Sequence, residues 1–347
     1  MSVPLFKDSD FTDSEIEDCK RSKKLLSIDL DVSCGCNLFC TYCYAGEQKP
    51  VEGELSLEQL FDIVDQVFEM GAKLICLVGE GEPLLYKNII KLIKYIRQKH
   101  MGVVLITNAT LITEELAQQL YDLEVSITVK LDSLDKNTQD KMAGIDGAYE
   151  KIQTGIINLL NLNYVSGRRQ IAIHTVLGKY NIQEIPSIWC WARERNIFPL
   201  VETPIIQGRA CEREDYNISS TEIMKVFKEL AAIDKEKYRY EWEPHVPIAG
   251  SECKRHFFSC YIDKFGNVYP CTSITLKVGS VLENSLQYII SNSEIIHKLR
   301  NIEKHIKGAC ASCAMDCYGC RAKPFHLHND IFGEDPSCWY TKAYKDQ

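Results

Sequence analysis

Apolar and polar residues alternate along the first two thirds of the chain as short apolar runs separated by longer amphipathic segments. The runs are rich in Ile, Val and Leu and have the length of buried strands. They predict six strands, at Leu25–Val32, Lys73–Val78, Val103–Thr107, Val125–Leu131, Ile171–Leu177 and Phe198–Ile206. The segments between them repeat apolar residues with a helical period and predict five helices, at Leu57–Met70, Lys87–Lys99, Thr113–Leu123, Tyr149–Leu162 and Ile182–Arg195.

Strands that alternate with helices of this length imply a parallel sheet, because each helix serves as the crossover between neighbouring strands. Ser56 and Gln59 occupy capping-box positions at the start of the first helix, which is expected to end near Gly71. Right-handed crossovers curl such a sheet into a partial (β/α)6 barrel of the α/β class, similar to a TIM barrel. Its site is expected at the C-terminal ends of the strands.

The same pattern divides the chain into four parts. An N-terminal extension of residues 1–24 precedes the barrel, which is expected over residues 25–215. A helical connector is expected over residues 216–247, because Ser220–Lys237 has a helical pattern. Residues 248–347 contain eight of the sixteen cysteines, so we expect a small cysteine-rich domain there.

Composition and charge exclude several classes of protein. The chain has 347 residues and a net charge of −8 without a basic stripe, which argues against a nucleic-acid partner. The segment from Met1 to Lys20 is acidic and lacks the apolar core of a signal peptide. No apolar run approaches the length of about 18 residues that spans a bilayer, so no membrane partner is expected. The cysteines are expected to serve as metal ligands in the cytoplasm rather than as disulfides.

The most informative motif is the loop Cys36-Asn-Leu-Phe-Cys40-Thr-Tyr-Cys43, which follows the first predicted strand. Its spacing wraps three thiolates around one compact ion or cluster. A closed structural site needs four ligands, whereas three ligands leave one iron of a [4Fe–4S] cube open to bind and transform another molecule. A zinc site would need a fourth ligand and usually pairs two CxxC motifs, and disulfides would need an oxidising compartment.

This CxxxCxxC loop resembles that of the radical S-adenosylmethionine (SAM) enzymes. The resemblance implies that Cys36, Cys40 and Cys43 are catalytic and hold a [4Fe–4S] cluster whose open iron chelates SAM. It also implies that SAM is cleaved reductively to a 5′-deoxyadenosyl radical. Tyr42 matches the aromatic residue that precedes the third cysteine in this family.

A second motif, Gly79-Glu80-Gly81-Glu82-Pro83, follows the second predicted strand. It resembles the Gly-Gly-Glu-Pro motif that receives the amino group of SAM in the family. Gly81, Glu82 and Pro83 match that motif, whereas Glu80 stands where a glycine is usual. Glycine lets the backbone approach a ligand closely, and a carboxylate accepts hydrogen bonds from an ammonium group. The alternative is a simple turn between strand and helix.

Polar residues at the ends of the later strands are further candidates for contact with SAM or substrate. The resemblance places Asp132 and Ser133 near the ribose and carboxylate of SAM, but both residue types are also common in turns. Asn108 is expected to close the third strand over the cluster. The fifth and sixth strands contribute the cavity candidates His174, Asn181, Glu202 and Arg209, with a role in the core as the alternative.

The C-terminal cysteines have the layout of the SPASM domain of radical SAM enzymes. The Asp263–Asn267 turn predicts a hairpin that ends in Gly266-x4-Cys271, and a tight run of four cysteines and a distant last cysteine follow. The resemblance implies two fully ligated auxiliary [4Fe–4S] clusters, three clusters in all. The first would take Cys253, Cys260, Cys271 and Cys320, and the second would take Cys310, Cys313, Cys317 and Cys338. The run of four is shorter than the commonest family pattern.

Five cysteines remain after these eleven: Cys19, Cys34, Cys76, Cys190 and Cys211. Cys76 and Cys190 lie in apolar strand and helix patterns and are expected in the core. Cys211 follows the sixth strand. It is a candidate catalytic hydrogen donor, because epimerases of this class quench the substrate radical with a thiol.

The resemblance therefore implies an oxidoreductase that abstracts a substrate hydrogen and passes an electron to auxiliary clusters. Only 35 residues precede Cys36, too few for the leader-binding domain of many peptide-modifying relatives, and Thr272 stands where sulfatase-maturing relatives have aspartate. Both features favour a hydroxylated small molecule, such as an aminocyclitol or sugar. Modification of a peptide or protein is the alternative, and a non-catalytic iron–sulfur protein is a third hypothesis. The expected partners are the substrate and an electron donor such as flavodoxin or ferredoxin.

Overall fold

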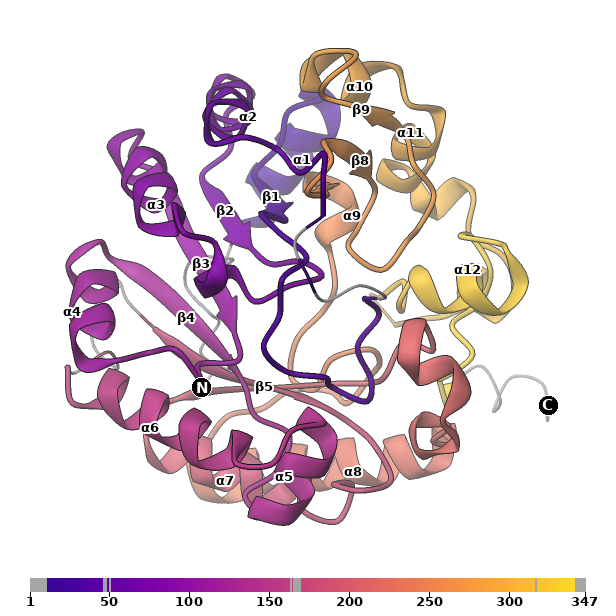
Figure 1. Cartoon of the computed structure of the whole chain (residues 1–347). Coiled ribbons are helices and arrows are strands. Elements are labelled where there is room, and N and C mark those ends of the chain that lie inside the picture. Colours follow the sequence, from indigo (N-terminus) through magenta and orange to yellow (C-terminus); the bar gives the residue numbers. More distant parts are fainter. Residues whose placement is uncertain are drawn as a thin grey trace.

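The computed structural model describes residues 11–45, 49, 51–162, 164, 170–315 and 317–340, in which helices surround a curved sheet (Figure 1). The first ten residues of the expected N-terminal extension and the last seven of the cysteine-rich domain lie outside the described residues. The six parallel strands are β1 (Ser27–Leu30), β2 (Leu74–Leu77), β3 (Gly102–Thr107), β4 (Val125–Lys130), β5 (Ile171–Val176) and β6 (Phe198–Glu202). Their connecting helices are α2 (Leu57–Glu69), α3 (Ile89–Gln98), α4 (Glu114–Asp122), α5 (Lys136–Ala143), α6 (Ala148–Leu160) and α7 (Ile185–Glu194).

Nine strands form one sheet in the order β6-β5-β4-β3-β2-β1-β7-β8-β9. The first six pair in parallel and form the barrel part, which confirms the predicted α/β class. The short strand β7 (Tyr261–Ile262) pairs in parallel with β1, and β8 (Asn267–Tyr269) and β9 (Gly279–Ser280) continue antiparallel from it. The C-terminal hairpin is therefore a continuation of the barrel sheet.

Alternation along the strands separates a core face from a face that lines the barrel interior. Ile28, Leu30, Ile75 and Leu77 are fully buried among the residues of the main hydrophobic core. On β1 the residues between them, Ser27 and Asp29, turn the other way, because successive side chains of a strand point to opposite faces.

Local signals position the first crossover helix as predicted. The Ser56 side chain accepts a hydrogen bond from the Gln59 backbone, and the Gln59 side chain accepts one from the Ser56 backbone, which completes the capping box. The helix ends just before Gly71, whose φ of +85° favours glycine. Four residues of α2 on one face are buried against the sheet: Leu60, Ile63, Val64 and Val67.

Helices α1 (Asp13–Ser22) and α5 were not predicted from the sequence, and neither were the short helices after residue 250. Helix α1 is mostly charged and buries only Ile16 and Cys19, and α5 buries only four of its eight residues. Because both are short and largely polar, their apolar residues are too few to produce a clear helical period.

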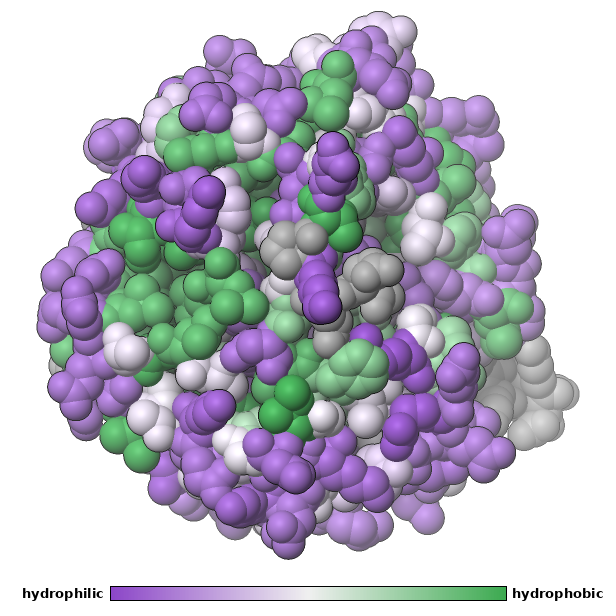
Figure 2. Space-filling view, in the orientation of Figure 1, coloured by the Kyte–Doolittle hydropathy of each residue, from purple (hydrophilic) through white to green (hydrophobic). Residues whose placement is uncertain are grey.

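The C-terminal part builds a second, smaller core. Its helices are α8 (Ser220–Ile233), α9 (Arg255–Phe258), α10 (Leu286–Asn292), α11 (Glu294–Arg300) and α12 (Ala322–His328). Leu299, Ile302 and Ile331 are buried there, and Cys271 and Cys320 pack against them. In the part of the chain that is described, no helix is both long enough and apolar enough to cross a membrane. Figure 2 shows hydrophilic residues around the rim of one face and hydrophobic residues mostly nearer its middle.

Candidate active site

The three-cysteine loop follows β1 and is held against the end of α5. The backbone N–H groups of Phe39 and Thr41 donate to the carbonyls of Ala143 and Met142, each at 2.9 Å. A Cβ on Gly144 would lie 2.2 Å from the Phe39 carbonyl oxygen, so only glycine permits this approach. The loop conformation is therefore fixed by α5, a helix far from it in the sequence.

Arg209 holds the loop from the opposite side. Its backbone N–H donates to the Cys43 carbonyl at 3.0 Å, and its Nε donates to the Cys40 carbonyl at 2.9 Å. A further guanidinium nitrogen donates to the Ala45 carbonyl at 3.2 Å, and the group stacks over the Phe39 ring at 4.1 Å. Sequence analysis named Arg209 as a cavity candidate, whereas the structure engages it with the loop backbone.

The thiols of this loop fit an iron–sulfur cluster. Burial raises the pKa of Cys40, and the Cys43 and Cys36 thiols raise it further. Backbone N–H groups of Leu38 and Ala45 donate to the sulfurs of Cys36 and Cys43, at 3.5 and 3.4 Å. Such N–H···S bonds stabilise thiolate ligands and tune a cluster. The donor set would hold a cluster through three thiolates.

The glycine-rich turn after β2 packs directly on this loop. A Cβ on Gly79 would lie 2.0 Å from the Asp31 carboxyl carbon, and one on Gly81 would lie 2.2 Å from the Ser33 carbonyl oxygen. The Glu82 N–H donates to the carbonyl of Gly35 at 2.8 Å. Gly81 is required because the turn is in backbone contact with the start of the cysteine loop, and Gly79 is required because the Asp31 side chain lies against it.

Glu82 ties this turn to the end of β3. One carboxylate oxygen accepts from the Thr107 hydroxyl at 2.6 Å and from the Leu84 N–H at 3.1 Å, and the other accepts from the Asn108 N–H at 2.7 Å. Burial raises its pKa, while these hydrogen bonds lower it. A carboxylate has about four acceptor positions, so three are engaged here. Pro83, also buried, begins the short helix that follows.

Asn108 links the third strand to the cysteine loop. Its amide nitrogen donates to the Asn37 side-chain oxygen at 2.8 Å, and Asn37 in turn donates to the Thr110 hydroxyl at 2.8 Å. Asn37 lies between Cys36 and Leu38, so this pair of amides fixes the loop beside its first cysteine.

The predicted SAM residues after β4 are engaged with protein groups. The Tyr42 hydroxyl donates to Asp132 at 2.6 Å, and the other Asp132 oxygen accepts from the Val176 N–H at 2.9 Å. Ser133 is fully buried and donates its hydroxyl to Glu184. The structure thus gives Tyr42 and Asp132 the role of joining the loop to β4 and β5, and it turns the Ser133 hydroxyl towards α7.

His174 and Glu202 lie together in the barrel interior. The His174 Nε2 is 3.2 Å from a Glu202 carboxylate oxygen. Burial alone would raise the pKa of Glu202, but the charge and hydrogen bond of His174 lower it to about 2. Asn181 does not join them: it is fully buried, and its amide donates to the backbone carbonyls of Asp132 and Val176.

His174 and Glu202 line a cavity of about 880 Å³. The interior faces of β1–β6 form one wall, and the segment from Trp242 to Arg255 forms another. Cys253 and Cys317 of the cysteine-rich part also line it, so the cavity extends from the barrel to the C-terminal cysteines. Among the residues predicted to contact SAM or substrate, His174 and Glu202 line this cavity, whereas the following do not: Tyr42, Gly81, Glu82, Pro83, Asn108, Asp132 and Ser133.

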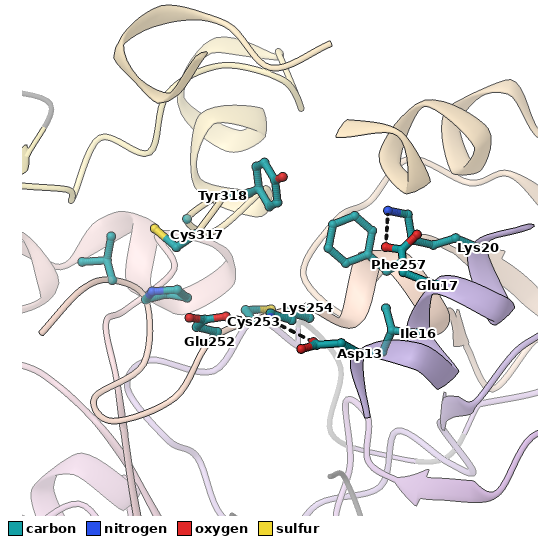
Figure 3. A pocket seen from close by; sticks show the side chains of 13 residues that line it. Asp13, Ile16, Glu17, Lys20, Glu252, Cys253, Lys254, Phe257, Cys317 and Tyr318 are labelled. Atoms are coloured by element: carbon teal, nitrogen blue, oxygen red, sulfur yellow. Dashed lines mark hydrogen bonds and ion pairs between the residues drawn. The ribbon is translucent and has the colours of Figure 1, made fainter. Parts of the chain in front are cut away.

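A smaller cavity of about 190 Å³ lies beside the larger one. Figure 3 shows Cys253 and Cys317 on one side of it and Ile16, Glu17 and Lys20 of α1 on the other. Asp13 and Ile16 of α1 line both cavities together with Cys253 and Cys317, so α1 contributes to the walls beside these two cysteines.

Electrostatic effects connect several of the C-terminal thiols. Burial raises the pKa of Cys320 to about 12, and the thiols of Cys253 and Cys271 contribute to this shift. Burial likewise raises the pKa of Cys317 to about 12, with contributions from a second set of thiols: Cys338, Cys313 and Cys310. These thiols include seven of the eight expected ligands, all except Cys260, and their partition between two clusters stays a prediction.

The missing cysteine is Cys260. It is 1% exposed and lies in the main hydrophobic core, and its carbonyl accepts from the Asp29 N–H in the pairing of β1 with β7. The next residue, Tyr261, donates its hydroxyl to Asp31 on the interior face, so alternation directs Cys260 to the opposite face. The structure does not bring Cys260 to the other thiols of its expected set.

The leftover cysteines occupy different environments. Cys76 lies on β2, lines the large cavity and is hydrogen-bonded to Asp29, so it is buried as expected but faces the interior. Cys190 is partly buried beside Lys237. Cys211 is exposed on the short helix Gly208–Glu212 and does not line either described cavity.

Sequence analysis missed charged residues that organise the barrel interior. Asp29 pairs with Arg255, and Asp31 accepts from the Glu80 N–H at 3.2 Å, while Lys264 pairs with the Glu80 carboxylate. The available signal was the segment Ser27-Ile-Asp-Leu-Asp31, in which polar residues alternate with apolar ones on a buried strand.

The fold is a parallel partial barrel with three thiols after its first strand and further cysteines in its C-terminal part. These features are typical of an iron–sulfur enzyme built on a partial (β/α) barrel. Comparison with known families identifies both parts. Residues 30–188 match the radical SAM superfamily, and residues 253–318 match the SPASM iron-sulfur cluster-binding domain. The chain belongs to the radical SAM enzymes that carry a SPASM domain. Its cofactors are SAM, the [4Fe–4S] cluster of the loop and further iron–sulfur clusters of the SPASM part.

Individual relatives extend over most of the chain. The AdoMet-dependent heme synthase of Methanosarcina barkeri is 28% identical, over 91% of this chain and 96% of that protein. The mycofactocin maturase MftC of Mycolicibacterium smegmatis is 25% identical, over 89% of this chain and 81% of that protein. Among solved structures, SuiB of Streptococcus suis bound to its precursor peptide SuiA has a TM-score of 0.71 at 15% identity, over 94% and 79% of the two chains. That likeness concerns the fold.

Proposed function

We propose that this chain oxidises a hydroxyl-bearing organic substrate by removal of two hydrogens in the large cavity. The observation that supports the proposal is the position of His174 and Glu202 in the same cavity as Cys253 and Cys317. The bound cofactors would supply hydrogen-atom abstraction at the barrel end and electron acceptance at the SPASM end. The ligands would be Cys36, Cys40 and Cys43 at the first end, and the two C-terminal thiol groups at the second.

The protein itself has to manage the proton of the hydroxyl group. Oxidation of an alcohol carbon to a carbonyl releases the carbon hydrogen, one electron and the hydroxyl proton. The His174 imidazole lies in the cavity, and the Glu202 carboxylate at 3.2 Å orients it and would stabilise its protonated form. We assign His174 as the proton acceptor and Glu202 as the residue that positions it.

The charges of the cavity favour a substrate that also carries amino groups. Its lining contains the four carboxylates of Asp13, Glu202, Glu243 and Glu252, against the two cations Lys254 and Arg255. Both cations already pair with acidic residues: Lys254 with Asp13 and Glu252, and Arg255 with Asp29. The excess of negative charge suits the ammonium groups of an aminocyclitol or amino sugar.

A peptide substrate is the second candidate, and the cavity volume favours it. Ligand pockets commonly have volumes of roughly 300–1,000 Å³, and the 880 Å³ found here is near the upper end, larger than one sugar ring requires. The mycofactocin maturase relative and SuiB, bound to its precursor peptide, also point in this direction. In either case an external low-potential donor, such as flavodoxin or ferredoxin in the cytoplasm, would reduce the cluster of the loop.

The test uses anaerobically reconstituted, reduced protein with SAM and two substrate panels, aminocyclitols and short peptides. The expected result is 5′-deoxyadenosine formed together with an aminocyclitol product that has lost two hydrogen atoms. Deuterium at the oxidised carbon should appear in 5′-deoxyadenosine. His174→Asn should retain deuterium transfer but lower product yield at least tenfold. Turnover with peptides alone would replace the first candidate by the second, and a product with unchanged mass would refute oxidation.

A further inference from the structure

Glu80 is the one residue of the turn 79–83 that departs from the family motif, and its side chain has a defined partner. The Glu80 carboxylate forms an ion pair with the Nζ of Lys264, which belongs to the C-terminal part of the chain. The Lys264 side chain is 5% exposed and that of Glu80 is 33% exposed. A lysine this buried is rare unless it is paired, so the contact is a specific feature of this junction.

The backbone explains why the Glu80 side chain points to Lys264. Gly79 and Gly81 press against Asp31 and Ser33, which leaves no room for a side chain on the cysteine-loop side of the turn. The Glu80 N–H donates to Asp31 at 3.2 Å, which anchors the residue at the end of β1. The side chain is thereby directed away from the loop.

Lys264 itself is held by a rigid hairpin turn. One Asp263 carboxylate oxygen accepts from the N–H groups of Phe265 and Asn267, at 2.9 and 2.8 Å, and the Lys264 carbonyl accepts from the Leu55 N–H at 2.8 Å. The turn joins β7 to β8, and β8 leads directly to Cys271. Lys264 thus extends from the SPASM hairpin to the barrel.

The contact continues through the turn to the cysteine loop. On one side of Glu80 is the Lys264 ammonium, and two residues later the Glu82 N–H donates to the Gly35 carbonyl, one residue before Cys36. Burial by itself would lower the pKa of Lys264, but Glu80 and Asp31 beside it raise it, so the ammonium stays charged. A charged, buried donor fixes its partner more strongly than a neutral one.

We propose that Lys264 is a positioning residue for SAM: through Glu80 it sets the backbone of the turn that receives the SAM amino group. The inference rests on the proposed role of this turn in binding SAM, and it adds that a residue of the SPASM domain governs that binding. In this chain the ion pair of Glu80 with Lys264 helps to hold the turn in place, whereas a glycine at this position would have no side chain to do so.

The test measures SAM affinity in the anaerobically reconstituted enzyme by equilibrium dialysis, for Glu80→Gln and Lys264→Met, with iron content and Tm recorded for each. If the pair positions the turn, both variants should bind SAM at least tenfold more weakly. The double variant should be no weaker than the worse single variant, because both remove the same interaction. The matched control is Lys307→Met, which breaks the Lys307–Asp330 ion pair elsewhere in the C-terminal part and should leave SAM affinity unchanged.

If the Glu80 carboxylate instead attracted SAM directly, the two variants would change SAM affinity in opposite directions. Glu80→Gln would weaken binding, whereas Lys264→Met would strengthen it by freeing the carboxylate. That pattern would overturn the proposal. Affinities within twofold of the parent in both variants, with iron retained, would show a role in stability alone and would also overturn it. If Lys264→Met is insoluble, Glu80→Gln is compared with the charge-swapped double variant Glu80→Lys with Lys264→Glu. The proposal requires that Glu80→Gln loses SAM affinity and that the charge-swapped variant recovers it. None of these readouts depends on the identity of the oxidised substrate.

Discussion

Asp234 offers a quantitative test of how the wall of the large cavity is held. It is fully buried, and its carboxylate accepts from Trp189 at 2.8 Å, from Arg193 at 3.0 and 2.7 Å, and from Trp242 at 3.0 Å. Trp242 lines the cavity, so this carboxylate fastens the segment after α8 to α7. Asp234→Asn keeps the shape but leaves the buried Arg193 cation without its counter-charge.

Loss of one partner of a buried ion pair costs about 3–5 kcal/mol. With an unfolding entropy of about 2.1 cal/mol/K per residue, a chain of 347 residues gives a decrease in Tm of about 4–7 °C. Calorimetry with a second scan to check reversibility would measure it, since the conversion from free energy to Tm holds for equilibrium unfolding. The control is Glu294→Gln, an exposed i,i+4 pair with Lys298, for which no resolvable change is expected. A decrease below 2 °C for Asp234→Asn would refute the reasoning.

Three further predictions follow from the site. Cys260→Ala should retain the iron content of the parent, about 12 per chain if three cubes are present, whereas Cys271→Ala should lose about four; equal losses would place Cys260 among the ligands. Tyr42→Phe should lower the free energy of unfolding by about 1.5–3 kcal/mol, since the Asp132 carboxylate loses the hydrogen bond that it accepts from the Tyr42 hydroxyl; an unchanged value would mean that water replaces this bond. Burial, with Arg321 and Lys20, lowers the pKa of His256 to about 3 in the folded protein. As the pH decreases below about 6.5, His256 is protonated in the unfolded chain but not in the folded one, so the free energy of unfolding falls. Denaturant unfolding should show a loss of about 2 kcal/mol from pH 7 to pH 5 that is absent in His256→Leu, and identical slopes would exclude His256 as the cause.

The barrel architecture could be predicted from the sequence because β1–β6 are runs of Ile, Val and Leu, as expected for buried strands. Crossover helices separate these runs and predict that the strands are parallel. The cysteine spacing was equally informative, since a ligand loop is local in sequence. Helix α5 escaped prediction because it is short and largely polar. Its contacts with Phe39 and Thr41 could not be predicted either, because they are made by backbone carbonyls, which any sequence provides.

The finer assignments depended on information that spacing does not carry. Cys260 lies at a plausible interval, but the face it occupies is set by the pairing of β7 with β1, which is remote in the sequence. Ser133 has the right residue type for ribose contact, yet its partner Glu184, the residue just before α7, is 51 positions away. Arg209 was predicted as a residue that could face the cavity, but its partners are carbonyl oxygens of the loop, and no side-chain motif encodes them.

The continuity of the sheet has a consequence for how this enzyme can be divided. Strand β1 is an interior strand only because β7 covers one side of it, and β7 belongs to the C-terminal part. A truncated chain that ends before Tyr261 would expose the N–H and C=O groups of β1, directly beside the cysteine loop, as an open edge. Exposed edges of this kind recruit strands from other molecules. The barrel, although it carries the radical chemistry, should therefore self-associate when expressed alone, and exchange of SPASM domains between relatives should succeed only when the hairpin Tyr261–Tyr269 stays with the barrel.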